Sequence, residues 1–204
     1  RARAAAKPLA KADLVETVRL EALALFAKNE TGKAENALRD ARKIYPQEDV
    51  LLDTLFYIYF KNGRLADGMK VIDEQLAINP DNIRALLNKG ATAIELTNSP
   101  MAIAALDHAL KLQPDNPNAL RNRAIARMKA GQWEEAQKDY QALLKMMPDS
   151  FAIYYGLGEV AYQRKDYAKA LEHFQMFMKL APEATREYQD VKKRIAEIKE
   201  AKAK

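Results

Sequence analysis

Five prolines recur at one fixed spacing through most of the chain. Each lies 34 residues after the one before it, at Pro46, Pro80, Pro114, Pro148 and Pro182. A constant period of this length indicates a stack of one repeated supersecondary element, in which each repeat contacts only its neighbours. The spacing therefore predicts an elongated solenoid, an architecture whose concave surface commonly binds other chains.

Other positions repeat with the same period and indicate where helices pack. Two of these positions hold small residues in every repeat except for Phe56. Small residues allow the backbones of crossing helices to approach closely. These positions hold Ala34, Gly68, Ala102, Ala136 and Ala170, and Ala22, Phe56, Gly90, Ala124 and Gly158. Two larger positions hold Leu38, Ile72, Leu106, Tyr140 and Phe174, and Val18, Leu52, Leu86, Leu120 and Tyr154. Each repeat is therefore expected to be a pair of packed helices.

Helices separated by short turns account for the sequence between the prolines. Apolar residues follow helical spacing, as at Leu157 and Val160, and no strand-like alternation occurs. Turn-forming residues interrupt each repeat, as at Gly63 and Gly131, and Pro100 suits the first turn of a helix. The connectors that hold the periodic prolines end one helix and offer asparagine or aspartate to cap the next.

These positions, and two segments in particular, resemble the tetratricopeptide-repeat family. The segments are ALRNRAIARMKAGQWEEAQKDYQALLKMMP and YYGLGEVAYQRKDYAKALEHFQMFMKLAP, which carry the family's order of large, small, turn, alanine, aromatic and proline residues. The resemblance implies an all-α, right-handed superhelix of five 34-residue helix-turn-helix repeats. The repeats are placed at 15–48, 49–82, 83–116, 117–150 and 151–182.

The two ends of the chain lie outside the repeats. Residues 183–204 keep helical amphipathicity, with an apolar stripe that includes Val191 and Ile198. We interpret this segment as the helix that caps the last repeat and keeps its apolar face from water. Residues 1–14 form a basic, alanine-rich N-terminal segment.

Three residues depart from the repeat pattern. Phe56 replaces a small residue and Gln75 replaces the usual alanine, both in the second repeat. The bulk of Phe56 predicts a local opening or change of curvature. Arg127 falls at a position that is otherwise apolar, so its stem is expected to pack while its head reaches water.

Composition and charge narrow the classes of function. The chain has no cysteine, so it has no disulfide, thiolate zinc site or cysteine nucleophile. The net charge is +5, but residues 12–184 carry 22 basic and 24 acidic residues, which argues against a clustered nucleic-acid face. No apolar run approaches the ~20 residues of a membrane span, and no signal-peptide core occurs. The sequence fits a cytosolic chain as well as an exported one with a leader or anchor upstream of Arg1.

Catalytic and cofactor chemistry is not indicated. His108 and His173 lie on separate repeats without a second ligand one helical turn away, so neither predicts a metal site. The sequence has no glycine-rich phosphate loop, nucleophile elbow or His-Glu metalloprotease motif. We therefore predict a non-enzymatic chain with no catalytic, cofactor-binding or metal-binding residues.

The resemblance places the first helix of each repeat on the concave face. The candidate peptide-binding residues are Tyr57, Arg84, Asn88, Asn118, Arg121, Asn122, Tyr155 and Tyr162. An asparagine amide both donates and accepts, so asparagines 34 residues apart suit successive peptide groups of an extended ligand. Arginine suits a carboxylate, and tyrosine supplies rigid amphipathic contact area.

Three hypotheses for the function follow. The leading one is a protein-protein interaction scaffold that binds a peptide or protein segment in its concave groove. The second is a structural protein that self-assembles into a homo-oligomer. The third is an accessory domain of a larger or membrane-anchored complex. The sequence identifies neither the partner nor its pathway.

Overall fold

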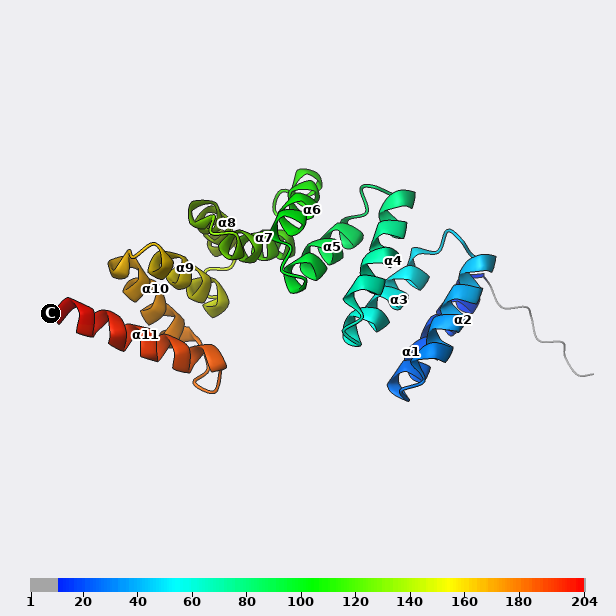
Figure 1. Ribbon diagram of the computed structural model, residues 1–204, viewed down its shortest axis with the longest axis horizontal. Coiled ribbons are helices and arrows are strands. Elements are labelled where there is room, and N and C mark those ends of the chain that lie inside the picture. Colours follow the sequence, from blue (N-terminus) through cyan, green and yellow to red (C-terminus); the bar gives the residue numbers. More distant parts are fainter. Residues whose placement is uncertain (1–10, 204) are drawn as a thin grey trace, which may run out of the picture. The chain divides into compact units, whose positions relative to one another are not determined.

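The computed structural model describes residues 11–203, and this part of the chain is all-α, as predicted (Figure 1). It contains eleven helices and no strand within that range. The helices are α1 (Lys11–Ala27), α2 (Thr31–Ile44), α3 (Asp49–Lys61), α4 (Leu65–Ile78), α5 (Ile83–Glu95), α6 (Ser99–Leu112), α7 (Pro117–Lys129), α8 (Trp133–Met146), α9 (Phe151–Gln163), α10 (Tyr167–Leu180) and α11 (Arg186–Ala203). We call α1, α3, α5, α7 and α9 the first helices and α2, α4, α6, α8 and α10 the second helices of the repeats.

The chain divides into two compact units, Arg1–Asn88 and Lys89–Lys204. In the first unit α1 packs on α2 and α3, and α3 packs on α4. In the second unit each helix from α6 to α11 packs on the next one along the chain. Helices that follow one another therefore lie side by side within each unit, as the repeat pattern predicts (Figure 1).

One backbone turn joins the first and second helix of every repeat. A residue with positive φ occurs at Asn29, Gly63, Thr97, Gly131 and Lys165, again 34 residues apart. The amide of the next residue donates to the carbonyl five residues earlier, as from Glu30 N to Leu25 O at 2.9 Å. This Schellman arrangement satisfies carbonyls at the end of the first helix. The period seen in the sequence is thus also a period of backbone conformation.

The periodic prolines lie two residues beyond the end of each second helix. Pro80, for example, follows α4, and Pro114 follows α6. Asn82 Oδ1 then accepts from Ala85 N at 3.1 Å, and Asn116 Oδ1 accepts from Ala119 N at 3.0 Å. These side chains cap α5 and α7 as predicted, because they satisfy amides that have no partner within the helix.

Small residues lie buried where helices of a repeat cross. A Cβ at Gly158 would lie 2.4 Å from Phe174 Cδ1, so the ring occupies the space that a side chain would need. In the second repeat the large residue of this crossing lies on the first helix, and the residue without a side chain lies on the second helix. Phe56 is buried at 8% exposure, and its Cδ2 lies 3.4 Å from the position of a Cβ at Gly68, where the other repeats have alanine. The absence of a side chain at Gly68 provides room for Phe56.

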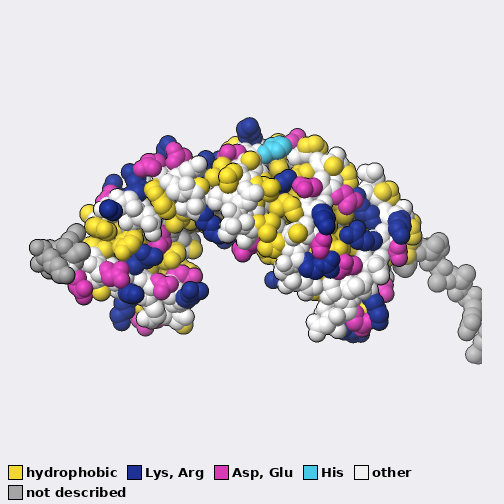
Figure 2. Space-filling model, in the orientation of Figure 1, with side chains coloured by type: hydrophobic (Ala, Val, Ile, Leu, Met, Phe, Trp, Pro, Cys, Tyr) yellow, Lys and Arg dark blue, Asp and Glu magenta, His cyan; other side chains and the backbone are white. Residues whose placement is uncertain are grey.

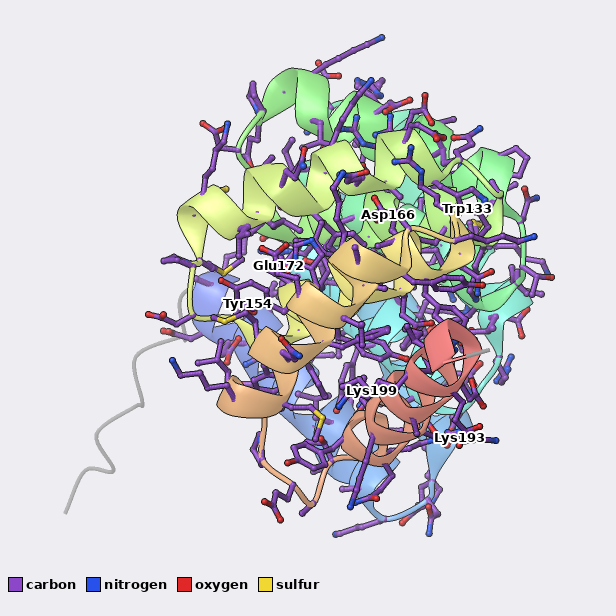
Figure 3. The ribbon with its side chains drawn as sticks, turned by 90° about the vertical axis from the view of Figure 1, so that its left-hand side faces the viewer. Trp133, Tyr154, Asp166, Glu172, Lys193 and Lys199 are labelled. Carbon is purple, nitrogen blue, oxygen red and sulfur yellow. The ribbon has the colours of Figure 1, made fainter. Side chains whose placement is uncertain are left out.

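The helix α11 covers the end of the last repeat. Val191 and Ile198 are buried at 0% and 2% exposure in a cluster with Phe177, and the Tyr188 ring lies 6.4 Å from the Phe177 ring. Figure 3 shows Lys193 and Lys199 extending from this helix. The amphipathic C-terminal segment therefore forms the predicted capping helix, with its apolar side on α10.

The N-terminal prediction falls largely outside the described residues. The basic segment was placed at 1–14; positions up to 10 are not described, and Lys11 to Leu14 form the first turn of α1. Within residues 11–203, no helix combines the length and the hydrophobicity that crossing a membrane requires.

Candidate functional site

In the first unit, two of the predicted groove residues line one surface depression. Tyr57 and Arg84 face a depression of about 350 Å³ together with Arg19, Leu23 and Thr54. The Tyr57 side chain is 44% exposed, and its edge-on contact with Phe26 holds the ring at a centroid distance of 6.2 Å. The depression thus offers an aromatic surface beside two guanidinium groups.

Arg84 lies at the border of a second, more polar depression. This depression of about 620 Å³ is lined by Asp49, Asp53, Asp81 and Asn82 as well as Arg84. Arg84 Nη1 pairs with Asp53 Oδ2, although 68% of the arginine side chain stays exposed. The guanidinium that was predicted to bind a ligand carboxylate therefore already has an internal carboxylate partner.

The same Asp53 explains one departure from the repeat pattern. Gln75 is 1% exposed, and its Nε2 donates to Asp53 Oδ1 at 2.8 Å. A buried amide needs such a partner, because an unsatisfied donor would cost desolvation energy. Gln75 on α4 thus orients Asp53 on α3, and Asp53 in turn holds Arg84 on α5. Asn88 is half-buried on the same helix as Arg84.

In the second unit, α7 and α9 line a cavity of about 480 Å³. Its walls are mainly apolar and include Ile125, Met128 and Ile153, with Arg121 and Tyr155 among the lining residues. Asn118, Arg121 and Asn122 are all carried by α7, and Asn118 Oδ1 lies 3.5 Å from Arg121 Nη2. The structure therefore places five predicted residues on α7 and α9, of which Arg121 and Tyr155 face one cavity.

Tyr140 and Gly156 also line this cavity, although neither was among the predicted groove residues. A Cβ at Gly156 would lie 2.4 Å from Tyr140 Cζ, so the phenol ring packs directly on the glycine backbone. Burial raises the pKa of Tyr140 to about 12, which keeps its hydroxyl protonated. The repeat spacing could have identified Gly156 as a groove position, because it lies 34 residues after Asn122 and 68 residues after Asn88, two of the predicted groove residues.

The other predicted tyrosine of the second unit is engaged by the capping helix. Tyr162 Oη donates to Glu197 Oε2 at 3.3 Å, and the Arg194 guanidinium lies 4.6 Å from the centre of its ring. Both partners belong to α11. Tyr162 therefore helps to attach the cap, whereas Tyr155, whose ring packs 5.6 Å from Phe177, still reaches the cavity.

A buried carboxylate lies beneath the same helix. Glu159 is 7% exposed, and Arg194 Nε lies 3.0 Å from its Oε1 without the alignment of a hydrogen bond. Burial raises the pKa of Glu159 above its usual 4.5, and the opposing attraction of Arg194 does not cancel this effect. Because a raised carboxyl pKa favours the protonated form in the folded state, this contribution to stability is lost as the pH rises.

We expect Glu159→Gln to remove this pH dependence. At a pH below the ordinary glutamate pKa, the protonated glutamate of the wild type and the glutamine of the variant are both neutral and similar in shape. The wild type and the variant should therefore melt at similar temperatures. As the pH rises through the folded-state pKa of Glu159, the wild-type chain should lose stability relative to the variant. The difference in melting temperature, followed by circular dichroism from pH 4 to pH 7, checks this; a difference that does not grow with pH would contradict it.

The prediction that the head of Arg127 extends into water is wrong. Its head turns toward a buried carboxylate instead of extending into water: 16% of the side chain is exposed, and its Nη1 donates to Asp139 Oδ2 at 2.7 Å. Asp139, at 3% exposure, also accepts two hydrogen bonds from Arg123, which in turn pairs with Asp107 at 2.6 Å. The physical reason is the buried carboxylate on α8, which provides the guanidinium with an internal partner.

Charge and metal chemistry add no further site. Figure 2 shows basic and acidic side chains interspersed over the visible face, with apolar side chains between them. Within residues 11–203, no group of three or more histidine, aspartate or glutamate side chains is arranged to hold a metal ion.

Comparisons with known proteins agree with the repeat pattern. Two family models, each described as tetratricopeptide repeat, match residues 83–116 and 121–185. Among solved structures, the chain is similar to MamA 41-end from Desulfovibrio magneticus RS-1, with a TM-score of 0.74 and 19% identity over 81% of this chain and 94% of that one. Another MamA crystal structure gives a TM-score of 0.71 and 17% identity over 78% and 92%. At these identities the likeness shows a shared helical-repeat fold. The search of curated protein sequences gave no match.

Proposed function

Because the chain belongs to the tetratricopeptide-repeat family, we propose that it is a non-enzymatic scaffold that binds a peptide or protein segment along the first helices of its repeats. The observation that carries this proposal is the composition of the two lined surfaces. In the first unit Tyr57 and Arg84 border one depression, and in the second unit Arg121 and Tyr155 border another. Arginine and tyrosine are enriched among the residues that dominate binding energy in protein interfaces.

The asparagines on the first helices support a peptide ligand in particular. Asn118 is exposed, and Asn88 and Asn122 are half-buried. An amide can donate to a peptide carbonyl and accept from a peptide N–H at the same time. Extended segments present both groups at every residue, so such side chains suit a backbone rather than one particular side chain.

Two double variants test this function. In Arg84→Ala with Asn88→Ala, and in Arg121→Ala with Asn122→Ala, the changed side chains lie partly or largely at the surface, so helicity should be retained. We expect at least one of them to reduce binding of the partner at least tenfold, because truncated interface arginines commonly cost more than about 1.4 kcal/mol. Affinity capture from a native lysate, quantified by mass spectrometry, measures this, and the pair of variants tells which unit binds.

A matched control changes two exposed lysines on second helices. Lys33→Ala with Lys70→Ala removes two surface charges from α2 and α4, which are not first helices. This control should capture the same proteins as the unchanged chain. If both groove variants also capture the same proteins, binding takes place elsewhere and the proposal fails.

Self-assembly is a second candidate, favoured by one specific observation. The last residue of four second helices is a large apolar side chain that faces water: Ile44 at 69%, Ile78 at 46%, Leu112 at 40% and Met146 at 44% exposure. Exposed apolar groups at a regular position suit contact with another protein surface. Light scattering tests self-assembly. A homo-oligomer would be supported if the mass of the wild-type chain rises with concentration and the mass of the double variant Ile44→Ser with Ile78→Ser stays that of one chain.

The accessory-domain hypothesis stays a prediction. It places the repeats within a larger or membrane-anchored complex, and the length of the native polypeptide tests it. A groove-bound partner is compatible with that arrangement, so the two variants described above remain informative in either case.

A further inference from the structure

The cavity of the second unit combines an apolar interior with one arginine that lacks an acidic partner. Among the described residues Arg121 makes no ion pair, and its only hydrogen-bond contact is the 3.5 Å approach to Asn118. This distinguishes it from Arg84, which pairs with Asp53. The other cation of the cavity, Lys129, donates to Ile94 O at 3.1 Å and so has a protein acceptor. Neither contact neutralises a charge, but the contact of Arg121 is the longer of the two, so Arg121 is the cation of the cavity that is better placed to pair with an acidic ligand.

Tyr140 contributes one of the uncharged polar groups of the cavity, beside Ser150 and Tyr155. Its ring lies over Gly156, in the space that a side chain at that position would fill. Within the described part of the chain, no hydrogen bond engages the Tyr140 hydroxyl, and Arg121 is close enough to influence its pKa. In the repeat register, Gly156 occupies the position held by Asn122 in the preceding repeat. The phenol of Tyr140, carried by α8 of the fourth repeat, thus fills the space that a side chain at Gly156 of the fifth repeat would occupy.

We propose that this cavity receives one large apolar side chain of a partner protein segment, and that an acidic side chain next to it in the segment pairs with Arg121. This inference rests on the proposed function and names the chemistry that the second unit recognises. The walls formed by Ile125, Met128 and Ile153 match an apolar side chain, and the Arg121 guanidinium, which makes no ion pair among the described residues, matches a carboxylate.

Two observations favour a protein segment over a small apolar anion. Asn118 and Asn122 flank Arg121 on α7, and their amides complement the peptide groups on either side of a bound residue. The hydroxyl of Tyr140 adds a donor for a carbonyl at the cavity. A fatty acid would use the apolar walls and the arginine but would leave these amide groups without a function. The volume of about 480 Å³ lies within the range of roughly 300–1,000 Å³ that is usual for ligand pockets.

A phage-displayed library of random dodecapeptides, selected against the full chain, tests the proposal. We expect the enriched peptides to share a large apolar residue directly beside an aspartate or glutamate. Their affinity should fall at least tenfold for Arg121→Glu, which reverses the charge, and for Ala152→Trp, which fills the cavity from an exposed position on α9. Tyr140→Phe keeps the ring over Gly156 and removes only the hydroxyl, so it should weaken binding several-fold.

The matched control is a charge change outside the cavity. Lys145→Glu makes the same kind of charge change on an exposed residue of α8 that does not line the cavity, and it should leave peptide affinity unchanged. Peptides that bind through Arg84 and Asn88 and tolerate both cavity variants would overturn this inference and leave the proposed function standing. A failure to enrich any peptide would count against both. Binding of dodecanoate that blocks the cavity, with no peptide competing for it, would assign the site to an apolar anion and overturn the proposal.

Discussion

Replacing Asp139 by alanine is expected to destabilise the second unit by about 3–5 kcal/mol, the usual cost of removing one partner from a buried ion pair. The Asp139 side chain is 4% exposed and accepts hydrogen bonds from Arg123 at 2.6 and 3.0 Å and from Arg127 at 2.7 Å. Without it, Arg123 and Arg127, whose side chains are 18% and 16% exposed, would keep only their contacts with Asp107 as ion pairs. Buried charges that lose a partner retain their desolvation penalty, which is why the effect is large.

The one tryptophan of the chain reports this effect locally. Trp133 begins α8, the helix that also carries Asp139, so its fluorescence during urea unfolding follows the second unit (Figure 3). The control is Asp107→Ala, which removes a carboxylate that is 41% exposed and should cost no more than about 1 kcal/mol. If the two variants unfold at the same urea concentration, the network does not stabilise the fold as described.

Gly158→Ala is expected to have the second large effect. The added Cβ would lie 2.4 Å from both Cδ1 and Cε1 of Phe174, a ring that is completely buried. Alanine improves helix propensity by about 1 kcal/mol, but overpacking a closed core commonly costs about 1–3 kcal/mol and more where the ring cannot move. Because the approach is so close, we expect the steric cost to exceed the gain in propensity and the melting temperature to fall.

A glycine in open surroundings provides the matched control for this substitution. Gly32 lies in the first turn of α2, and a Cβ there would have no neighbour within 4 Å. Gly32→Ala should therefore keep the gain in propensity and raise the stability by up to about 1 kcal/mol. Thermal unfolding of both variants by circular dichroism makes the comparison. A Gly158→Ala chain as stable as the wild type would mean that α9 and α10 do not pack as tightly as these contacts require.

The features that the sequence predicted are those that depend on local chemistry and on a constant register. The proline after each second helix, the turn between the helices and the asparagine caps all involve residues within a few positions of one another. For this reason Asn82 and Asn116 cap the helices that were expected to follow them. The small residues at helix crossings were equally predictable, because each repeat uses the same crossing.

The details that the sequence did not predict depend on partners in other helices. The head of Arg127 was expected in water because nothing near it in the repeat pattern indicates that Asp139 is buried. The exchange between Phe56 and Gly68 becomes clear only when the two helices are placed together. In the same way, Arg84 meets Asp53 from the preceding first helix, 31 residues away. A periodic pattern fixes which positions face each other, but the pairing depends on the individual side chains.

The predicted site residues differ in their surroundings. Tyr57 and Arg84 line one depression, and Arg121 and Tyr155 line another. Tyr162 was predicted to face a ligand but contacts α11 instead. Its sequence position was correct for a first helix, and the capping helix lies against that position. Whether the remaining residues bind a partner stays a prediction.

Site-specific photo-crosslinking shows directly whether the first helices hold the partner. A photoreactive phenylalanine derivative would be placed at Tyr57 on α3 or Ala152 on α9, and, for comparison, at the exposed Lys70 on α4 or Lys138 on α8. We expect a crosslinked partner to form from Tyr57 or Ala152 and not from either lysine position. Crosslinks that form only from Lys70 or Lys138 would contradict this expectation, because the partner would then lie on the second helices.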